Sequence, residues 1–226
     1  MLDNVTKDKF KDSFDEDQLL TQYLFADFQR KDIFDEYDEL VEVAPFVYEA
    51  APDIDAVRKI VMTKLAAYNE KKASKKMNLV IFDDALFHLL RICRVTNSPS
   101  GSILLVGVGG SGKQSLTKLS AFICKHLFFQ ISITKTYGDN QLKDDIRELY
   151  EQCGPLGGSA SFIMTDAEVK KDSFLEAINS MLATGEIPGL HGKEDREMIP
   201  QTIRQVYMKE VGTKGEDPSL NTLWKF

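Results

Sequence analysis

The stretch GVGGSGK, which runs from Gly107 to Lys113, decides the expected fold of this 226-residue chain. It fits the phosphate-binding pattern G-x-x-x-x-G-K, follows the apolar run Ser102–Val106 and precedes a helical pattern. In such a loop the glycines let successive backbone N–H groups point into one concave surface, while the lysine ammonium reaches the outer phosphates. This order of strand, loop and helix predicts a nucleoside triphosphate site. The alternative is a glycine-rich turn that holds no ligand.

The loop amides and Lys113 should dominate phosphate binding. A hydrogen bond to a charged group contributes about 1.5–3 kcal/mol, whereas a helix N-terminus contributes about 0.3–1 kcal/mol. The next residue is Gln114, where the pattern usually has a Ser or Thr that binds Mg²⁺, and Ser115 comes one position late. Because one helical position is a rotation of about 100°, the hydroxyl of Ser115 should not point to the usual metal position unless the local backbone adjusts. Gln114 can still offer its amide oxygen to the metal. This change should affect hydrolysis more than nucleotide binding.

A second nucleotide motif is expected at the end of the apolar strand pattern Ser161–Asp166. In nucleotide hydrolases, the carboxyl end of such a strand presents an aspartate to Mg²⁺ and a glutamate to the attacking water. If Asp166 binds the metal, Ala167 stands where the glutamate is needed. If Asp166 takes the place of the glutamate, Thr165 stands where the metal-binding aspartate is needed, so one carboxylate is missing in either case. Glu168 can substitute only if the strand has already ended and the loop turns back. The plainer interpretation of Asp166 is a capping residue after a buried strand.

The composition is that of a globular protein. Its 43% hydrophobic content is enough for a core. The formal charge of −7 is concentrated in residues 1–55, which carry 16 acidic and 5 basic side chains, so nucleic-acid binding is not expected. The three cysteines are about thirty residues apart, which favours reduced structural thiols. No apolar stretch reaches the length of about twenty residues that a membrane span needs, so we expect a cytosolic or cytoskeletal protein.

The composition changes near residue 52. Residues 1–52 are acidic and rich in aromatic side chains, so we expect short helices and turns on a larger body, with partial disorder. Residues 53–226 are typical of an incomplete α/β nucleotide-binding domain. The predicted helices cover residues 53–70, 83–93, 115–127, 139–153, 173–182 and 199–211, and the predicted strands cover 102–106, 128–133 and 161–166. Asp53 or Asp55 is the expected cap of the first helix, whose apolar residues recur at helical spacing from Val57, and Gly185 is expected to stop the fifth. Ser173 and Glu176 have capping-box spacing, and Pro200 is expected in the first turn of the last helix.

Several segments together resemble dynein heavy chains. They are residues 78–85, 101–116, 134–137, 144–146, 162–166, 174–179 and 184–188. The sequence GVGGSGKQS combined with the block FLEAIN, which begins at Phe174, is far more specific than a phosphate loop alone. More narrowly, roughly residues 20–210 look like the fourth AAA+ module of the motor ring in its axonemal form.

The resemblance implies an α/β P-loop NTPase fold of the AAA+ type, a three-layer sandwich with a parallel sheet. That sheet would be incomplete here and preceded by an α-helical N-terminal segment. The implied function is an ATP- or ADP-binding, Mg²⁺-dependent module of a microtubule motor, mainly regulatory, with weak or absent hydrolysis. The implied location is the cytoplasm and cytoskeleton, at the axoneme of cilia and flagella. The implied partners are neighbouring AAA+ modules of the same heavy chain. Intermediate chains, light chains and microtubules would be reached only through the rest of the motor, and no nucleic-acid or membrane partner is expected.

The resemblance also implies that the domain is truncated. Only 60 residues follow Asp166, which we expect to be too few for the remaining two strands, the polar sensor residue and the helical lid. Because the chain has no long heptad repeat, direct microtubule binding is not predicted. Two other interpretations stay open. One is a purely structural module that holds nucleotide without turnover, and the other is a P-loop small-molecule kinase, for which the region after the loop offers only three arginines.

The candidate site residues fall into three groups. The candidates for nucleotide binding are Gly107, Val108, Gly109, Gly110, Ser111, Gly112, Lys113, Gln114 and Ser115, together with Leu79 and Val80, which the resemblance places near the adenine. The candidates for Mg²⁺ are Gln114 and Asp166, and the catalytic candidates are Asp166 and Glu168. As plain apolar residues, Leu79, Val80 and Ile81 would be buried in any case.

Overall fold

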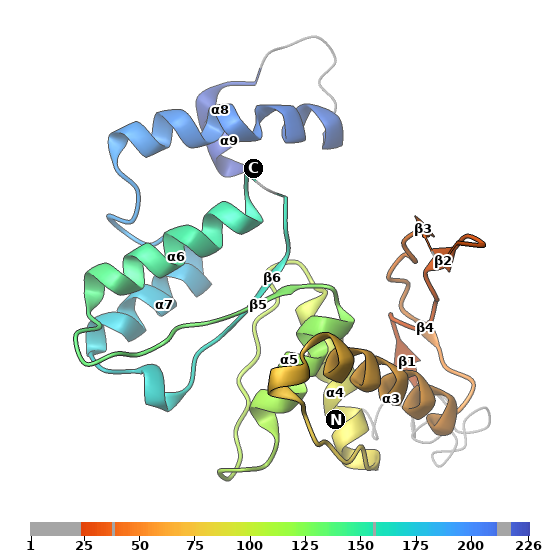
Figure 1. The fold of residues 1–226 in the computed structure, drawn as a ribbon. Coiled ribbons are helices and arrows are strands. Elements are labelled where there is room, and N and C mark those ends of the chain that lie inside the picture. The colour runs from red at the N-terminus through yellow and green to blue at the C-terminus, as the bar shows by residue number, and fades with distance from the viewer. Residues whose placement is uncertain (1–23, 38, 156, 212–217) are drawn as a thin grey trace, which may run out of the picture. The chain divides into compact units, whose positions relative to one another are not determined.

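A computed structural model describes residues 24–37, 39–155, 157–211 and 218–226 of the chain (Figure 1). The chain divides into two compact units, Met1–Cys124 and Lys125–Phe226. Each unit has its own hydrophobic core, and each is described by itself below.

Short antiparallel ribbons open the described part of the first unit. β1 (Phe25–Ala26) pairs with β4 (Glu49–Ala50), and β2 (Ile33–Phe34) pairs with β3 (Leu40–Glu42). Residues 24–52 thus contain short strands and turns where the sequence predicted short helices and turns. The backbone hydrogen bonds of this segment run between paired strands, because these residues lie opposite one another in two antiparallel ribbons. The part of the prediction that falls on residues 1–23 lies outside the described residues.

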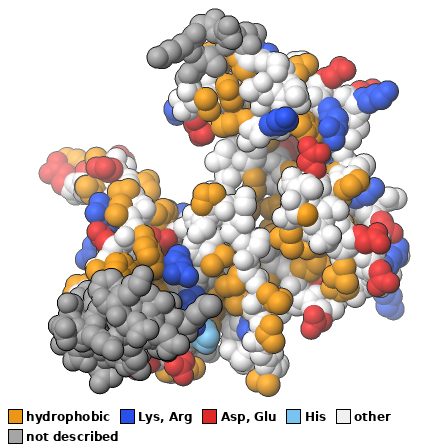
Figure 2. Space-filling model, turned by 180° about the vertical axis from the view of Figure 1, so that it is seen from behind, with side chains coloured by type: hydrophobic (Ala, Val, Ile, Leu, Met, Phe, Trp, Pro, Cys, Tyr) orange, Lys and Arg blue, Asp and Glu red, His pale blue; other side chains and the backbone are white. Residues whose placement is uncertain are grey.

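The β2–β3 ribbon exposes hydrophobic and acidic side chains side by side (Figure 2). The ribbons are nevertheless anchored to the first unit, because Ala26, Phe28 and Ala51 are buried in the same core as its helices. Asp27 lies between two of these anchors and accepts a hydrogen bond from the side chain of Asn97, at 2.5 Å. The acidic segment is therefore packed against the unit through apolar side chains. The prediction that its aromatic residues make this contact holds for Phe28 but is wrong for Phe25, Tyr37, Phe46 and Tyr48, which are exposed.

Three predicted helices form the body of the first unit: α3 (Ile54–Lys71), α4 (Asp83–Thr96) and α5 (Lys113–Ile123), with a short turn, η1 (Ala73–Lys75), after the first. All three are confirmed as helices, but the predicted end of the third at residue 127 is wrong, because α5 ends at Ile123. Asp53 caps α3 as predicted, since its carboxylate accepts a 2.7 Å hydrogen bond from the amide of Ala56. Val57, Val61 and Leu65 recur at a spacing of four residues and bury one face of this helix.

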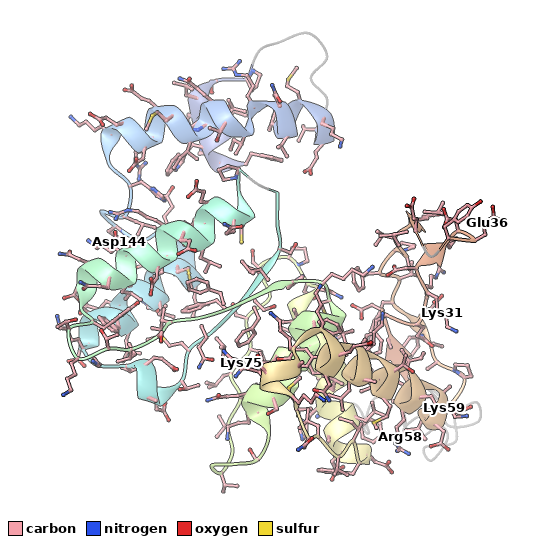
Figure 3. The ribbon with its side chains drawn as sticks, viewed as in Figure 1. Lys31, Glu36, Arg58, Lys59, Lys75 and Asp144 are labelled. Atoms are coloured by element: carbon pink, nitrogen blue, oxygen red, sulfur yellow. The ribbon has the colours of Figure 1, made fainter. Side chains whose placement is uncertain are left out.

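Two further contacts position α4 and α5 on α3. Arg58 of α3, labelled in Figure 3, forms ion pairs with Asp55 at 2.9 Å and with Asp83, the first residue of α4. Tyr68 of α3 packs edge-on against Phe122 of α5, with ring centroids 5.3 Å apart. The core that the helices share holds Leu86, Leu89 and Cys93 from α4 and Leu116, Leu119 and Ile123 from α5. The N-terminus of α5 is thus held by packing along the whole helix.

The predicted strand at residues 102–106 is wrong. These residues have no regular secondary structure, and no backbone hydrogen bond joins them to any other described residue. Leu104 and Val106 are 87% and 86% exposed. A strand is defined by its ladder of hydrogen bonds to a neighbour, and an apolar run supplies only the side chains for one.

The second unit is built on a small parallel sheet. β5 (Leu127–Gln130) pairs with β6 (Ala160–Ile163), with Leu127 opposite Ala160 and Gln130 opposite Ile163. The helix α6 (Asp139–Cys153) lies between them in the chain and makes the crossover that a parallel pair requires. Both predicted strands and this helix are confirmed, but each strand ends three residues before its predicted boundary because the ladder stops there.

All three cysteines of the chain are free thiols.

The remaining elements of this unit are η2 (Asp166–Glu168), α7 (Asp172–Thr184), α8 (Lys193–Glu210) and α9 (Leu220–Lys225). Gly185 ends α7 as predicted, in a left-handed conformation with φ of 75°. The predicted place of Pro200 in the first turn of a helix is wrong, since α8 begins seven residues earlier. There the carboxylate of Asp195 accepts the amide of Gly192 at 2.9 Å and organises the first turn.

The predicted capping box at the start of α7 is also wrong. The N-cap residue is Lys171, and Ser173 lies inside the helix, where its hydroxyl donates to Asp139 Oδ1 at 2.5 Å. The Lys171 ammonium binds the other oxygen of Asp139 at 2.7 Å. Hydrogen bonds from Lys171 and Ser173 lower the pKa of Asp139. Asp139 begins α6, so it joins the starts of two helices.

Among the described residues, no helix combines the length and apolar character needed to cross a bilayer.

Candidate nucleotide-binding site

The loop before α5 has the backbone shape of an anion site. Gly110 and Gly112 have φ of 77° and 81°, a left-handed conformation that glycine adopts without steric cost. Gly112 is the N-cap of α5, and its carbonyl accepts the amide of Leu116 at 2.8 Å. No side chain caps this helix, so the amides of its first turn remain free to bind an anion.

The loop also has room for a ligand. A Cβ atom added at Gly109, Gly110 or Gly112 would meet nothing within 4 Å, and residues 107–111 are exposed. A Cβ atom at Gly107 would instead lie 3.4 Å from the hydroxyl of Ser111 and 3.7 Å from the ammonium of Lys113. The open space therefore lies beside the later glycines, while the first one packs against the lysine. This arrangement fits the phosphate groups of a nucleotide.

The ammonium of Lys113 is held inside the loop. Its Nζ donates to the carbonyl oxygens of Gly107 at 2.7 Å and Val108 at 2.8 Å, and to the hydroxyl of Ser111 at 3.1 Å. Lys113 is the only charged residue between positions 101 and 117. The loop therefore presents one fixed positive charge together with open backbone amides, which is the combination that phosphate requires.

The two residues that follow the lysine are available for binding. Gln114 is exposed and Ser115 is half-buried, and neither side chain forms a hydrogen bond with another described residue. Within the described ranges, no group of three His, Cys, Asp or Glu side chains could hold a metal ion by itself. A Mg²⁺ ion at this loop would therefore take most of its ligands from phosphate and water. The metal role of Gln114 stays a prediction.

The apolar run before α4 belongs to the same unit as the loop. Leu79 is half-buried against the core and Ile81 is 7% exposed, but Val80 is 81% exposed. The prediction that all three are buried is wrong for Val80, because successive side chains of an extended segment point in opposite directions. Val80 thus has a free apolar surface, and its contact with a base stays a prediction.

The two acidic residues after β6 are placed differently, and both belong to the second unit. β6 ends at Ile163 and the chain turns back through η2. The carboxylate of Glu168 accepts the backbone amide of Thr165 at 2.5 Å and the side-chain amide of Gln130 at 2.8 Å. Glu168 is 8% exposed, whereas Asp166 is exposed. The chain therefore makes the turn that a role for Glu168 requires, but both carboxylate oxygens already have partners. The catalytic roles of both residues stay predictions.

Opposing effects act on the Glu168 carboxylate. Burial raises its pKa, and hydrogen bonds from Thr165 and Gln130 together lower the pKa by more, so the net shift is downward. An ionised carboxylate only accepts hydrogen bonds, which matches the three donor groups around it. The sequence did not predict that Gln130 and Thr165 bind Glu168. The T-x-x-E spacing of Thr165 and Glu168, which is that of a capping box, is the signal that could have found this pair.

A separate cavity of about 670 Å³ lies within the second unit, between the end of α6, the turn after α7, and helices α8 and α9. Its aromatic wall contains His191, whose ring centroid lies 6.2 Å from that of Tyr150 and 5.6 Å from that of Trp224. None of the candidate nucleotide or metal residues lines it. The loop Gly107–Lys113 is therefore the better candidate for phosphate binding.

Comparison with known proteins adds an independent observation. Residues 77–226 match the family described as "P-loop containing dynein motor region D4". The chain is 39% identical over 203 residues to dynein axonemal heavy chain 10 of Homo sapiens, a match that covers 90% of this chain and 4% of the relative. It is 41% identical over 180 residues to the dynein beta chain of the flagellar outer arm of Chlamydomonas reinhardtii, covering 80% of this chain and 4% of the relative. It is 35% identical over 211 residues to human dynein axonemal heavy chain 8, covering 92% of this chain and 5% of the relative. The chain thus spans only a small part of the length of the curated relatives it matches.

Proposed function

This chain belongs to the family of P-loop dynein motor region D4, and we propose that it binds ATP or ADP as a regulatory module of an axonemal dynein heavy chain. Its fold is the α/β P-loop fold of the AAA+ type, of which β5, β6 and the flanking helices are a part. The proposal depends on one combination of features at the glycine loop. The loop is open, the N-terminus of α5 is uncapped, and the ammonium of Lys113 lies inside the loop.

The chain's own residues divide the binding between them. Backbone amides from Gly107 to Gly112 and the first turn of α5 would surround the phosphates, and Lys113 would bind an oxygen of the β- or γ-phosphate. Leu79 and Val80 would contact the base, with Val80 providing the exposed surface. A bound Mg²⁺ ion would neutralise phosphate charge, and Gln114 would offer it an amide oxygen. Asp166 stays a candidate metal ligand on its sequence position alone.

The acidic residues support a role that is more regulatory than hydrolytic. Hydrolysis needs one carboxylate for the metal and another group that orients the attacking water. Asp166 is the only exposed carboxylate at the end of β6, because the chain continues with Ala167 and the oxygens of Glu168 already bind Thr165 and Gln130. We therefore expect weak or absent hydrolysis. A purely structural module that holds nucleotide is the limiting case.

The relatives suggest where the module acts. Their names place them in axonemes and in the flagellar outer arm. By this similarity the chain would act in the cytoskeleton, at the axoneme of cilia or flagella. Its direct partners would be the neighbouring AAA+ modules of the same heavy chain. Microtubules and the intermediate and light chains would be reached through other parts of the motor.

Calorimetry with the purified chain tests nucleotide binding. ADP and ATP, each with and without Mg²⁺, should bind the wild-type chain. Lys113→Ala should remove this binding, because it removes the only charge of the loop. Lys59→Ala is the matched control, since Lys59 is exposed on α3 of the same unit, and it should bind as the wild type does. A folded wild-type chain that gives no heat with either nucleotide would overturn the proposal.

Phosphate release separates a slow ATPase from a structural module. The structural module would bind ATP and release no phosphate above the rate of the Lys113→Ala variant. A slow ATPase would release phosphate, and the rate should fall in Asp166→Asn, which keeps the shape of the side chain but removes its charge. Rapid turnover that is unchanged in Asp166→Asn would contradict the proposed regulatory role and the role of Asp166 together.

A further inference from the structure

The ammonium of Lys113 uses all of its donor capacity within its own loop. A lysine ammonium has three N–H donors and no acceptor, and Lys113 Nζ has three acceptors in hydrogen-bonding range. Two are the backbone carbonyl oxygens of Gly107 and Val108, at 2.7 and 2.8 Å. The third is the hydroxyl oxygen of Ser111, at 3.1 Å. A phosphate oxygen that binds this ammonium must therefore replace one of the three.

The three acceptors differ in how readily they can be replaced. The carbonyls of Gly107 and Val108 belong to the backbone, and the Val108 carbonyl also accepts the amide of Ser111 at 3.4 Å, so releasing them would move the loop. The Ser111 hydroxyl is on an exposed side chain that can rotate about a single bond. It is also the most distant of the three acceptors. A charged phosphate oxygen is a stronger acceptor for an ammonium than a neutral hydroxyl. Ser111 is therefore the acceptor that a phosphate would displace.

We propose that Ser111 is a positioning residue that holds the third donor of Lys113 in the nucleotide-free loop and gives it up to a β- or γ-phosphate oxygen. This inference rests on the proposed function, since it concerns the same nucleotide site. The two carbonyls keep the ammonium in place after the exchange, so Ser111 is not needed to orient it in the complex. The main effect of the hydroxyl is then competition with the ligand, and it lowers the affinity for every nucleotide that reaches Lys113.

Binding measurements on the 226-residue chain test this competition. Ser111→Ala should bind ADP and ATP about two- to tenfold more tightly than the wild type, since the hydroxyl no longer competes with the phosphate for the ammonium. Ser111→Thr keeps a hydroxyl and should bind as the wild type does. AMP lacks the phosphates that Lys113 would contact, so its affinity should not change in Ser111→Ala. Ser180→Ala, on α7, is the control for a serine whose hydroxyl only contacts its own helix.

Unchanged or weaker binding of ADP and ATP by Ser111→Ala would overturn the inference and leave the proposed function intact. Wild-type protein that is folded and binds no adenine nucleotide would instead refute the proposed function.

A second measurement needs no nucleotide. Acetic anhydride labels free lysine amines, and mass spectrometry of peptides gives the rate at each lysine. Lys113 should be labelled several times faster in Ser111→Ala than in the wild type, Ser111→Thr or Ser180→Ala, because one of its three hydrogen bonds is gone. Equal rates in Ser111→Ala and the wild type would show that the hydroxyl does not hold the ammonium, whatever the binding data show. A merely structural serine would change the melting temperature and not this rate.

Discussion

The side-chain amide of Gln130 lies 2.8 Å from one carboxylate oxygen of Glu168 and ties the end of β5 to the turn that follows β6. The other carboxylate oxygen accepts the amide and the hydroxyl of Thr165. The ladder between the two strands ends at Gln130 and Ile163. A buried carboxylate thus extends the connection between the strands beyond their last backbone pair.

This relationship predicts a large effect for Glu168→Ala. The substitution leaves the donors of Gln130 and Thr165 without an acceptor, which should lower the free energy of unfolding by about 1–3 kcal/mol. Asp166→Ala removes an exposed carboxylate two residues away and should change it by less than about 0.5 kcal/mol. Urea denaturation followed by circular dichroism measures both. Similar small effects for the two variants would mean that the contact between Glu168 and Gln130 does not persist in solution.

Two leucines of the first unit test the segment before the loop. Leu104 is 87% exposed and Leu119 is fully buried in α5. Leu104→Ala should therefore change the free energy of unfolding by less than about 0.5 kcal/mol, while Leu119→Ala should lower it by about 2–5 kcal/mol. If Leu104→Ala is as costly as Leu119→Ala in the same denaturation experiment, residues 102–106 are buried as the strand that their sequence predicted.

Two loop glycines test the effect of backbone conformation alone, because neither is crowded by neighbouring atoms. A Cβ atom at Gly109 or at Gly112 would meet no neighbour, but only Gly112 has a positive φ, at 81°. Gly112→Ala should therefore lower the free energy of unfolding by about 1–2 kcal/mol, the cost of a left-handed conformation. Gly109→Ala should be neutral or stabilise the chain by up to about 1 kcal/mol, because alanine restricts the unfolded chain. Melting curves without nucleotide measure this difference, and equal effects would contradict the loop conformation.

His126 makes the stability of the second unit depend on pH. Burial lowers the pKa of His126, so the unfolded chain, with a histidine pKa of about 6.5, binds a proton at a higher pH than the folded chain does. The unfolded state then holds more protons just below that pH, and stability falls as the pH drops below it. The stabilising contribution of neutral His126 is complete above the histidine pKa of the unfolded chain. It is lost as the pH falls toward the lower pKa of His126 in the folded chain.

The melting temperature should accordingly decrease between pH 7 and about pH 5.5, and His126→Asn should make the decrease shallower. The asparagine keeps a polar group near the hydroxyl of Ser161, which lies 3.0 Å from Nδ1 of the histidine. Some dependence should remain, because burial also lowers the pKa of His191. An identical slope in wild type and His126→Asn would show that this imidazole is not the group that titrates.

Local signals in the sequence predicted most of the helices. The cap at Asp53, the four-residue spacing from Val57 to Leu65 and the stop at Gly185 all concern residues within a few positions of one another. The same kind of signal was misleading where two segments shared it. Thr165–Glu168 and Ser173–Glu176 have identical spacing, but only the first forms a capping box, and only the second was predicted to form one. Ser173 binds Asp139 instead, a residue 34 positions away that no local pattern indicates.

The candidate site divides in the same way. The sequence alone determined the glycine loop, the lysine after it and the start of α5, because left-handed turns and helix ends depend on neighbouring residues. Only the tertiary structure decided that the ammonium of Lys113 is shared with Ser111, that Leu104 is exposed, and that Glu168 is bound by Gln130. The physical reason is that burial, strand pairing and the choice between competing hydrogen-bond partners depend on which distant residues meet in space. The spacing of residues along the sequence does not show which distant residues come into contact.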